Sequence, residues 1–383
     1  MTKVAIVGLG WSGFSPEVVD MSFREMMFKA AQRAYEDAGG LDPRRDVDAF
    51  ISCQEDFWEG ISIADEFAPD PIGGAMKSVY TVAGDSLQCV GQAYAMIKSG
   101  LFDVVVVESH GKPSDILTLH DVMSMALDPI SLRPLGLANI HALAALEARA
   151  YMAKYGVGPQ HLAEVVEKAH RAGLRNPRAS YAGRLNAGDY ELSPVVVDPL
   201  READIAKFVD AAVVVVLASE AAARDLSDTP VWVEGVGWRT ETSTLELHDW
   251  AFPLHARMAA EDAYRQAKIA DPAKEVGFAE VDNRYSFKEL QHIEALGLAP
   301  RGSAAEMLLD GAFDPGGRLP VNLSGGALAE GVPLEVHGLA RLTYAASVMR
   351  GDVKAEVDRA ETAVVHSWRG VPTTTSAVAV LRR

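Results

Sequence analysis

Cysteine is almost absent from this chain, with only Cys53 and Cys89 among 383 residues. Two cysteines cannot supply the disulfide framework of a small secreted domain, and at this separation they form no metal-binding motif. We therefore expect no disulfide framework, no metal site and a reducing compartment. Cys89 is interpreted as a buried residue that packs like a small apolar side chain.

Basic residues are also scarce, since 36 lysines and arginines stand against 53 aspartates and glutamates and give a formal net charge of −17. This surplus argues against nucleic acid as a ligand, because its phosphates would be repelled. No apolar run reaches the roughly 20 residues that span a bilayer. The N-terminus begins a strand at once and shows no signal peptide. We expect a cytoplasmic protein without a membrane span.

What is present is an alternation of short apolar runs with segments of helical periodicity, which predicts an α/β layered fold. The first series comprises strands at 4–7, 47–52, 103–108 and 211–218 and helices at 22–38 and 86–99. The second comprises strands at 231–236, 277–281, 361–366 and 376–381 and helices at 254–268, 286–296, 303–309 and 325–350. The two series predict similar halves, residues 1–228 and 229–383. Residues at about 116–190, with helices at 139–155 and 160–172, are interpreted as a helical insertion.

Three segments carry a family pattern. Residues 78–115 begin SVYTVAGDSLQCVGQ, residues 279–290 read AEVDNRYSFKEL, and residues 319–338 read LPVNLSGGALAEGVPLEVHG. Together with a weaker match at 198–212, they resemble the thiolase superfamily, in particular its sterol-carrier-protein-x type and thiolase-like aldolase branch. The resemblance implies a five-layer αβαβα sandwich of two similar halves. It also implies a dimer formed through the N-terminal half.

The resemblance fails at the residues that perform thiolase chemistry. The nucleophilic Cys of the family falls on Ala83, and the His of its Gly-His-Pro turn falls on Val332. The His and Cys of its His-Asp-Cys segment fall on Asp282 and Arg284. Because a methyl group cannot form a thioester, ordinary thiolysis is the reaction least expected of this chain.

The remaining polar groups near these positions are candidates for other chemistry. Tyr285, Asp282 or His337 could accept a hydroxyl proton, and Arg284 could hold a carboxylate or lower the pKa of a neighbour. A structural Asp–Arg pair is the alternative for this loop. A retro-aldol cleavage of a β-hydroxyacyl group needs such a base for the β-hydroxyl and an oxyanion hole for the enolate.

A second group of candidates lies in two turns. The turn Ala83-Gly84-Asp85 opens a helix, whose N–H groups and dipole favour a negative charge such as an oxyanion. A simple N-cap is the alternative. Asn322 and Gly326 belong to the turn before the C-terminal helix, and Val332 follows them. These residues could line the substrate pocket or serve the backbone alone.

The resemblance leaves three functions open. The first is an enzyme that cleaves or forms a C–C bond of an acyl-CoA without a covalent intermediate, like the aldolases of steroid side-chain degradation, in complex with an OB-fold zinc-ribbon partner. The second is a catalytically silent subunit beside a Cys-bearing paralogue. The third is residual acyl transfer through Cys53 or Cys89, although Cys89 lies six residues after Ala83 and so faces away from it on a helix.

Coenzyme A is implied as part of the substrate by the resemblance alone, and no bound cofactor is expected. Its 3′-phosphate needs basic side chains. The residues available in or near the insertion are Lys112, Lys168, Arg171 and Arg175.

Overall fold

The computed structural model describes residues 2–55, 66–125, 127, 130, 139–242, 244–370 and 375–383. In this part of the chain, nine strands form a mixed sheet in the order β3-β2-β4-β7-β1-β8-β11-β10-β9. The strands of the N-terminal half are β1 (Val4–Ser15), β2 (Ala49–Cys53), β3 (Ser78–Val82), β4 (Val104–Gly111) and β7 (Asp210–Ser219). Those of the C-terminal half are β8 (Val231–Thr240), β9 (Phe278–Glu280), β10 (Thr362–Trp368) and β11 (Thr375–Arg382).

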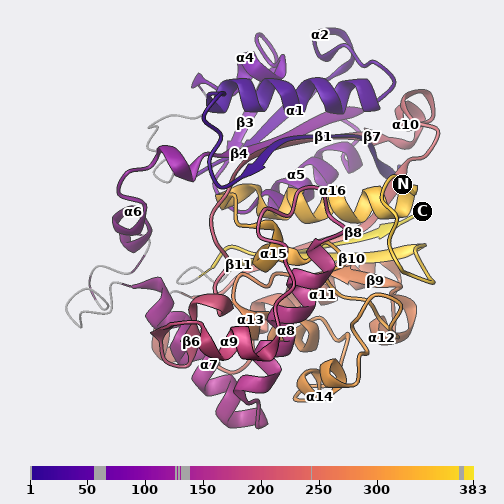
Figure 1. Ribbon diagram of the computed structural model, residues 1–383. Helices are drawn as coiled ribbons and strands as arrows, with labels where there is room; N and C mark the ends of the chain where they lie inside the picture. Colours follow the sequence, from indigo (N-terminus) through magenta and orange to yellow (C-terminus); the bar gives the residue numbers. More distant parts are fainter. Residues whose placement is uncertain are drawn as a thin grey trace.

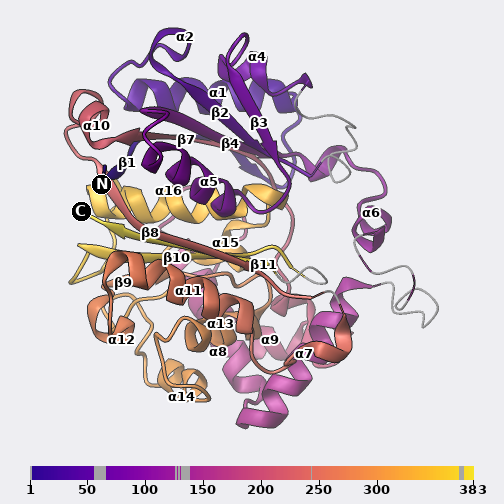
Figure 2. The same ribbon diagram turned by 180° about the vertical axis from the view of Figure 1, so that it is seen from behind.

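The two halves stack as layers (Figures 1 and 2). Helix α1 (Phe23–Asp37) covers the outer face of the N-terminal strands, and α11 (Leu254–Ala267) with α13 (Ser286–Ala295) covers the C-terminal strands from below. Helices α5 (Ser86–Lys98) and α16 (His337–Arg350) lie between the two layers of strands. The two layers join where residues 4–6 pair with residues 231–233. The predicted five-layer αβαβα arrangement is confirmed.

The insertion packs on the C-terminal half. Its elements are α6 (Leu119–Met125), α7 (Ile140–Tyr155), α8 (Pro159–Gly173) and the start of α9 (Ala187–Leu192), and it is followed by a two-stranded sheet of β5 (Val195–Val197) and β6 (Leu200–Arg201). Helix α8 contacts α13, α14 (Ala304–Leu309) and α15 (Gly326–Glu330). The remaining short elements are α2 (Pro43–Asp46), α4 (Pro69–Ile72), α10 (Glu220–Leu226), α12 (Pro272–Glu275), η2 (Pro113–Asp115), η3 (Glu202–Asp204), η4 (Leu245–Leu247) and η5 (Leu334–Val336). Among the described residues, no helix combines the length and apolar character needed to cross a membrane.

The first strand is longer than predicted. It was expected to end at Val7, with Gly8 closing the apolar run, but β1 continues through Gly10 to Ser15. The two glycines lie where α1 approaches the strand, and a Cβ atom at Gly8 would be 2.3 Å from the carbonyl oxygen of Ala34. At Gly10 a Cβ atom would be 2.0 Å from the carbonyl oxygen of Ala30. These glycines therefore permit close helix–strand packing instead of a turn.

The predicted helix at 325–350 is interrupted, so that prediction was wrong in its middle. Helix α15 ends at Glu330, and α16 begins at His337. Between them Gly331 has a φ of 101°, and Pro333 offers no amide hydrogen to a helix. The break lets the backbone of Val332 bond to Lys207 and Val209, just before β7, and places His337 at the start of a new helix.

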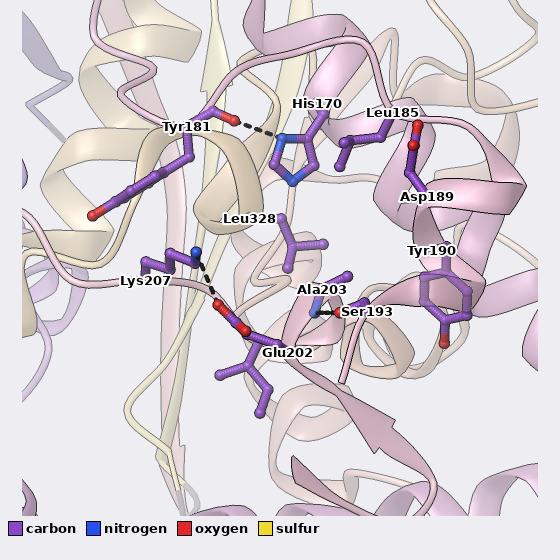
Figure 3. Close-up of a pocket in the computed structure, with 11 residues that line it drawn as sticks. His170, Tyr181, Leu185, Asp189, Tyr190, Ser193, Glu202, Ala203, Lys207 and Leu328 are labelled. Atoms are coloured by element: carbon purple, nitrogen blue, oxygen red, sulfur yellow. Dashed lines mark hydrogen bonds and ion pairs between the residues drawn. The ribbon is translucent and has the colours of Figure 1, made fainter. Parts of the chain in front are cut away.

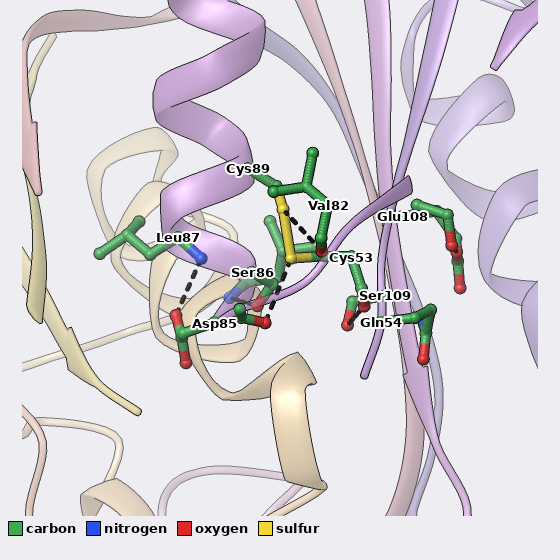
Figure 4. The surroundings of a disulfide bond; sticks show 12 residues. Cys53, Gln54, Val82, Asp85, Ser86, Leu87, Cys89, Glu108 and Ser109 are labelled. Carbon is green, nitrogen blue, oxygen red and sulfur yellow. Dashed lines mark hydrogen bonds between the residues drawn. A yellow bond between two sulfur atoms is a disulfide. The ribbon is translucent and has the colours of Figure 1, made fainter. Parts of the chain in front are cut away.

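The two cysteines form a disulfide, which corrects the expectation that they would stay unpaired (Figure 4). Cys53 ends β2, and Cys89 lies in the first turns of α5, with their Cα atoms 6.2 Å apart. Sequence reasoning missed the pair because β2 and α5 become neighbours only in the folded layers. The bond anchors the start of α5 to the sheet. It also leaves neither thiol free to carry an acyl group.

Reduction of this disulfide is expected to lower the free energy of unfolding by about 3–4 kcal/mol, since the bond closes a loop over a sequence separation of 36 residues. Urea unfolding of protein refolded with and without dithiothreitol measures the difference. The Cys53→Ala/Cys89→Ala double variant is the control and should give one curve under both conditions. Coincident curves for the wild type would contradict the prediction.

Candidate active site

Two adjoining cavities lie between the start of α5, the loop before α13 and the break between α15 and α16. The Asp85 cavity, of about 40 Å³, is lined by Glu55, Asp85, Met123, Phe208, Arg284, Val332, Leu334, Glu335 and Arg369. The Tyr285 cavity, of about 60 Å³, is lined by Met123, Ile140, His141, Ile205, Ala206, Phe208, Arg284, Tyr285, Val332, Trp368, Arg369 and Gly370. Four residues singled out in the sequence, Asp85, Arg284, Tyr285 and Val332, therefore meet around one hollow region.

Local structure explains why these four residues come together. Asp85 is the N-cap of α5, where its side chain accepts the Leu87 N–H. Arg284 and Tyr285 occupy the short loop between β9 and α13. Val332 lies in the break before α16 and bridges to Phe208. Loops at the ends of buried elements commonly carry binding and catalytic groups.

Tyr285 is paired with a histidine from the insertion. Its hydroxyl lies 3.0 Å from Nδ1 of His141, in the first turn of α7. Burial raises the pKa of Tyr285 above its usual value, and Arg284 opposes that shift. At neutral pH the hydroxyl is therefore protonated. A hydroxyl bonded to an imidazole can accept one proton while it releases another.

Arg284 is held by backbone carbonyls. Its guanidinium donates to the carbonyl oxygens of Arg369 at 3.0 Å and Trp368 at 3.2 Å, and it lies 5.8 Å from the Trp368 ring. Nε of Arg284 has no hydrogen-bond partner among the described residues. Because Arg284 lines both cavities, its positive charge faces any ligand that enters either one.

Asp282 lies behind the cavities in a fully buried network. Its carboxylate is 3.2 Å from Nε2 of His337 and 3.4 Å from Arg341, and it accepts the Arg284 N–H at 2.9 Å. Burial opposes ionisation, but Arg341, His337 and Arg284 hold the pKa of Asp282 well below its usual range. Asp282 is therefore an ionised counter-charge rather than a group poised to exchange protons near neutral pH.

His337 is neutral in this network. Burial and the Arg341 charge lower the pKa of His337 to about 3. Nε2 of His337 lies 2.5 Å from the Arg341 guanidinium and 3.2 Å from the Asp282 carboxylate, so the three side chains form one buried cluster. Neither His337 nor Asp282 is among the residues that line the two cavities.

The other predicted pocket residues do not line these cavities. The side-chain amide of Asn322 donates to Glu289 at 2.7 Å and accepts the Val281 N–H at 2.7 Å. Both ends of the amide are therefore engaged within the core. A Cβ atom at Gly326 would be 2.2 Å from Oδ1 of Asn283. Gly84 is buried and Ala83 is exposed beside Asp85.

The basic residues proposed for a 3′-phosphate are dispersed. Lys168 is buried and lies 2.9 Å from Glu289, so it faces the core. Lys112 pairs with Asp115 at 2.6 Å. Arg171 and Arg175 lie together with Arg184 along an open surface hollow of about 830 Å³. The acidic residues of that hollow are Glu167, Asp314 and Glu356.

A separate cavity of about 340 Å³ lies between α8, α9 and the segment at 200–207 (Figure 3). Nδ1 of His170 donates to the Tyr181 carbonyl at 2.6 Å, and Lys207 pairs with Glu202 at 3.1 Å at its rim. Ile205 lines both this cavity and the Tyr285 cavity. None of the candidate catalytic residues line it.

Sequence reasoning missed three residues that complete the site. His141 comes from the insertion, and Ser367, which donates to Asp85, comes from β10, so both contacts depend on the tertiary fold. Arg341 was within reach of sequence reasoning. It follows His337 by four residues on a helix, a spacing that places two side chains on one face.

The chain is similar to known proteins in both sequence and fold. Residues 238–383 match the family "Thiolase C-terminal domain-like". The chain is 28% identical to an acetyl-CoA acetyltransferase of Methanothermobacter thermautotrophicus over 380 residues, which cover 97% of each chain. It is also 28% identical to the 17-hydroxy-3-oxo-4-pregnene-20-carboxyl-CoA lyase of Mycobacterium tuberculosis over 386 residues, again covering 97% of each. Residues 238–383 thus match a thiolase C-terminal domain, and over nearly its whole length the chain is similar to thiolase-like enzymes.

Solved structures agree on the fold. The Ltp2–ChsH2(DUF35) aldolase superimposes with a TM-score of 0.84 at 24% identity, over 99% of this chain and 97% of that one. The full-length relatives thus include both an acyltransferase and a C–C lyase on one scaffold. Both of these relatives are named for acyl-CoA chemistry.

Proposed function

We propose that this protein cleaves a C–C bond of a β-substituted acyl-CoA without a covalent intermediate, by a retro-aldol or Claisen-type reaction or the related acyl transfer. The observation that carries the proposal is the Tyr285–His141 pair, which lines a cavity together with the cation Arg284. By its resemblance to the family motif, the sequence has a methyl group, Ala83, where a thiolase carries its nucleophile. The only two cysteines are joined to each other.

The geometry supports a retro-aldol cycle in which Tyr285 serves the β-oxygen. The β-hydroxyl of the thioester donates its proton to the Tyr285 oxygen, and the phenolic proton passes to Nδ1 of His141. The electron pair of the breaking C–C bond moves toward the thioester carbonyl and gives an enolate. Arg284 and the N-terminus of α5 are placed to stabilise that negative charge. In this scheme the loop that carries Arg284 is held in position by the buried carboxylate of Asp282, which in turn contacts His337 and Arg341.

The assembly and location of the protein are proposed from its similarity to thiolase-like enzymes. The solved Ltp2–ChsH2(DUF35) aldolase has a partner chain, and we propose that this protein likewise works with an OB-fold zinc-ribbon partner. A homodimer through the N-terminal half, two halves divided near residue 228 and a cytoplasmic location belong to the same proposal. The lyase relative acts on a steroid thioester by its name, which makes lipid or steroid acyl-CoA the first substrates to test.

The alternative is a silent subunit of a thiolase or acyltransferase complex. The size of the cavities favours it, since about 40 and 60 Å³ is far below the roughly 300 Å³ at which ligand pockets begin. A subunit of this kind would bind a Cys-bearing paralogue and show no turnover of its own.

Mass spectrometry of purified protein with a panel of thioesters tests these functions. The panel holds acetoacetyl-CoA with free CoA, and β-hydroxyacyl-CoAs with straight, branched and steroidal acyl groups, each assayed with and without a co-purified small partner. We expect a β-hydroxyacyl-CoA to be cleaved without free CoA. Thiolysis of acetoacetyl-CoA through a covalent acyl-enzyme, seen as a mass adduct on the protein, would contradict the proposal. No product from any substrate, together with a co-purified Cys-bearing paralogue, would establish the alternative.

A further inference from the structure

The Asp85 carboxyl group is held on one side and open on the other. Oδ1 accepts the Leu87 N–H at 2.9 Å and also the Ser367 hydroxyl. Oδ2 has no hydrogen-bond partner among the described residues, although the side chain is buried and 4% exposed. Figure 4 shows the second oxygen directed away from α5 and from the disulfide. A buried polar atom without a partner is uncommon in folded proteins and calls for a function.

The surroundings of Asp85 close off its Oδ1 side. On the Oδ1 side Gly338 packs so closely that a Cβ atom there would lie within 2.2 Å of that oxygen. The Asp85 cavity lies elsewhere around the carboxyl group, and Arg284, Glu335 and Arg369 are among its charged walls. Ligand atoms that enter this cavity therefore lie beside both Asp85 and Arg284, and Oδ2 is the Asp85 oxygen not already engaged by a hydrogen bond.

The hydrogen bonds also decide where a proton on Asp85 would be. Because Oδ1 already accepts two hydrogen bonds, the neutral acid carries its proton on Oδ2. Burial raises the pKa of Asp85, while Ser367 and the Leu87 N–H act in the opposite direction. The carboxyl group can therefore present either a donor or a lone pair to the cavity, as a general acid or base must.

We propose that Oδ2 of Asp85 transfers the proton to and from the α-carbon of the acyl-CoA thioester. This proposal rests on the proposed function, because the thioester enolate is its partner. In cleavage, the Oδ2–H bond and the C–C bond break, and an α-C–H bond and a ketone or aldehyde form. The β-hydroxyl proton leaves through Tyr285 and His141. The cycle closes when His141 releases that proton to solvent and Asp85 takes one up.

Two proton sites on one substrate give two separable reactions. Tyr285 acts on the β-oxygen, whereas Asp85 acts on the α-carbon and needs no β-substituent. An acyl-CoA without a β-hydroxyl, such as propionyl-CoA, should therefore exchange its α-hydrogens with solvent on this protein. No oxidant, reductant or co-substrate is required, since only protons are exchanged.

The test is incubation of the full chain with propionyl-CoA in D₂O, followed by mass spectrometry of the thioester. The wild type is expected to incorporate deuterium, and Asp85→Asn to slow incorporation by about 10²–10⁴-fold, the usual contribution of a general acid–base group. Asp85→Ser is the second variant, because serine also caps a helix and preserves α5. Asp310→Asn makes the same change at an exposed site and should leave the rate unaltered. Circular dichroism of each variant checks the fold.

The outcomes separate this inference from the proposed function. Exchange that is lost in both Asp85 variants supports Asp85, even if no β-hydroxyacyl-CoA is ever cleaved by the wild type. Cleavage by the wild type together with unchanged exchange in folded Asp85→Asn overturns the role of Asp85 and leaves the proposed function standing. A wild type that neither exchanges propionyl-CoA nor cleaves any thioester overturns both.

Discussion

Replacing Asp282 by Asn is expected to lower the free energy of unfolding by about 3–5 kcal/mol, because it removes the counter-charge of a buried arginine. Arg341 is 1% exposed, and its guanidinium lies 3.4 Å from Asp282. Asparagine keeps the volume and the oxygen that accepts the Arg284 N–H, so the lost charge dominates the effect. Urea unfolding at pH 7 measures the difference. A change below about 1 kcal/mol would show that Arg341 finds compensation elsewhere.

The difference in free energy of unfolding between the wild type and Asp282→Asn should depend on pH. The folded-state pKa of Asp282 is held well below its usual value, so its contribution to stability is present above the unfolded pKa of about 4. That contribution is lost as the pH falls below about 4 toward the folded pKa. The gap between wild type and Asp282→Asn should therefore narrow under acid conditions. Asp310→Asn, at an exposed position, should match the wild type within about 0.5 kcal/mol.

The second large effect is expected for Tyr285→Phe, which should reduce cleavage of a β-hydroxyacyl-CoA by about 10²–10⁴-fold while the fold survives. Phenylalanine keeps the ring that packs near Phe287 and Trp368 but lacks the hydroxyl bonded to His141. The proton of the β-hydroxyl then has no acceptor at that position. Turnover of the substrate found in the thioester panel, followed with thermal unfolding, tests the prediction.

A matched tyrosine separates catalysis from stability. Tyr264→Phe on α11 also removes a buried hydroxyl, which donates to the Leu296 carbonyl at 2.8 Å, but Tyr264 does not line either cavity. It should cost about 1 kcal/mol of stability without a change in turnover. Equal rates for wild type and Tyr285→Phe would refute the role of Tyr285 in the cycle.

Much of the fold could be predicted from the sequence, because the local periodicity of apolar residues predicts buried strands such as 211–218 and helices such as 254–268. The failures arose where a distant element decides the outcome. The Cys53–Cys89 bond depends on β2 and α5 meeting in space, and Gly8 was interpreted as a strand end although α1 packs against it. Near residue 331 the apolar spacing predicted a continuous helix, but Gly331 and Pro333 disfavour one, and the structure has a break there.

For the candidate site, the sequence predicted the loops that line the cavities but not the side chains that hydrogen-bond to their residues. Asp85, Arg284, Tyr285 and Val332 were each expected near a pocket, and the structure gathers them around two cavities. The difference between Asp282 and Asp85 was hidden, because both are buried aspartates in loops. Only their neighbours show that one carboxylate is neutralised by cations while the other has an oxygen free of hydrogen bonds among the described residues.

The origin of His141 in the insertion has a consequence for how activity and unfolding are coupled. Helix α7 is attached to α13 by the Lys288–Glu147 pair at 2.9 Å and the Tyr151–Glu294 hydrogen bond at 2.9 Å. A local opening that lifts α7 breaks these two contacts and separates His141 from Tyr285, while the sheet stays intact. The population of closed α7, which amide hydrogen exchange reports, then sets an upper limit on the fraction of molecules competent for turnover at any moment.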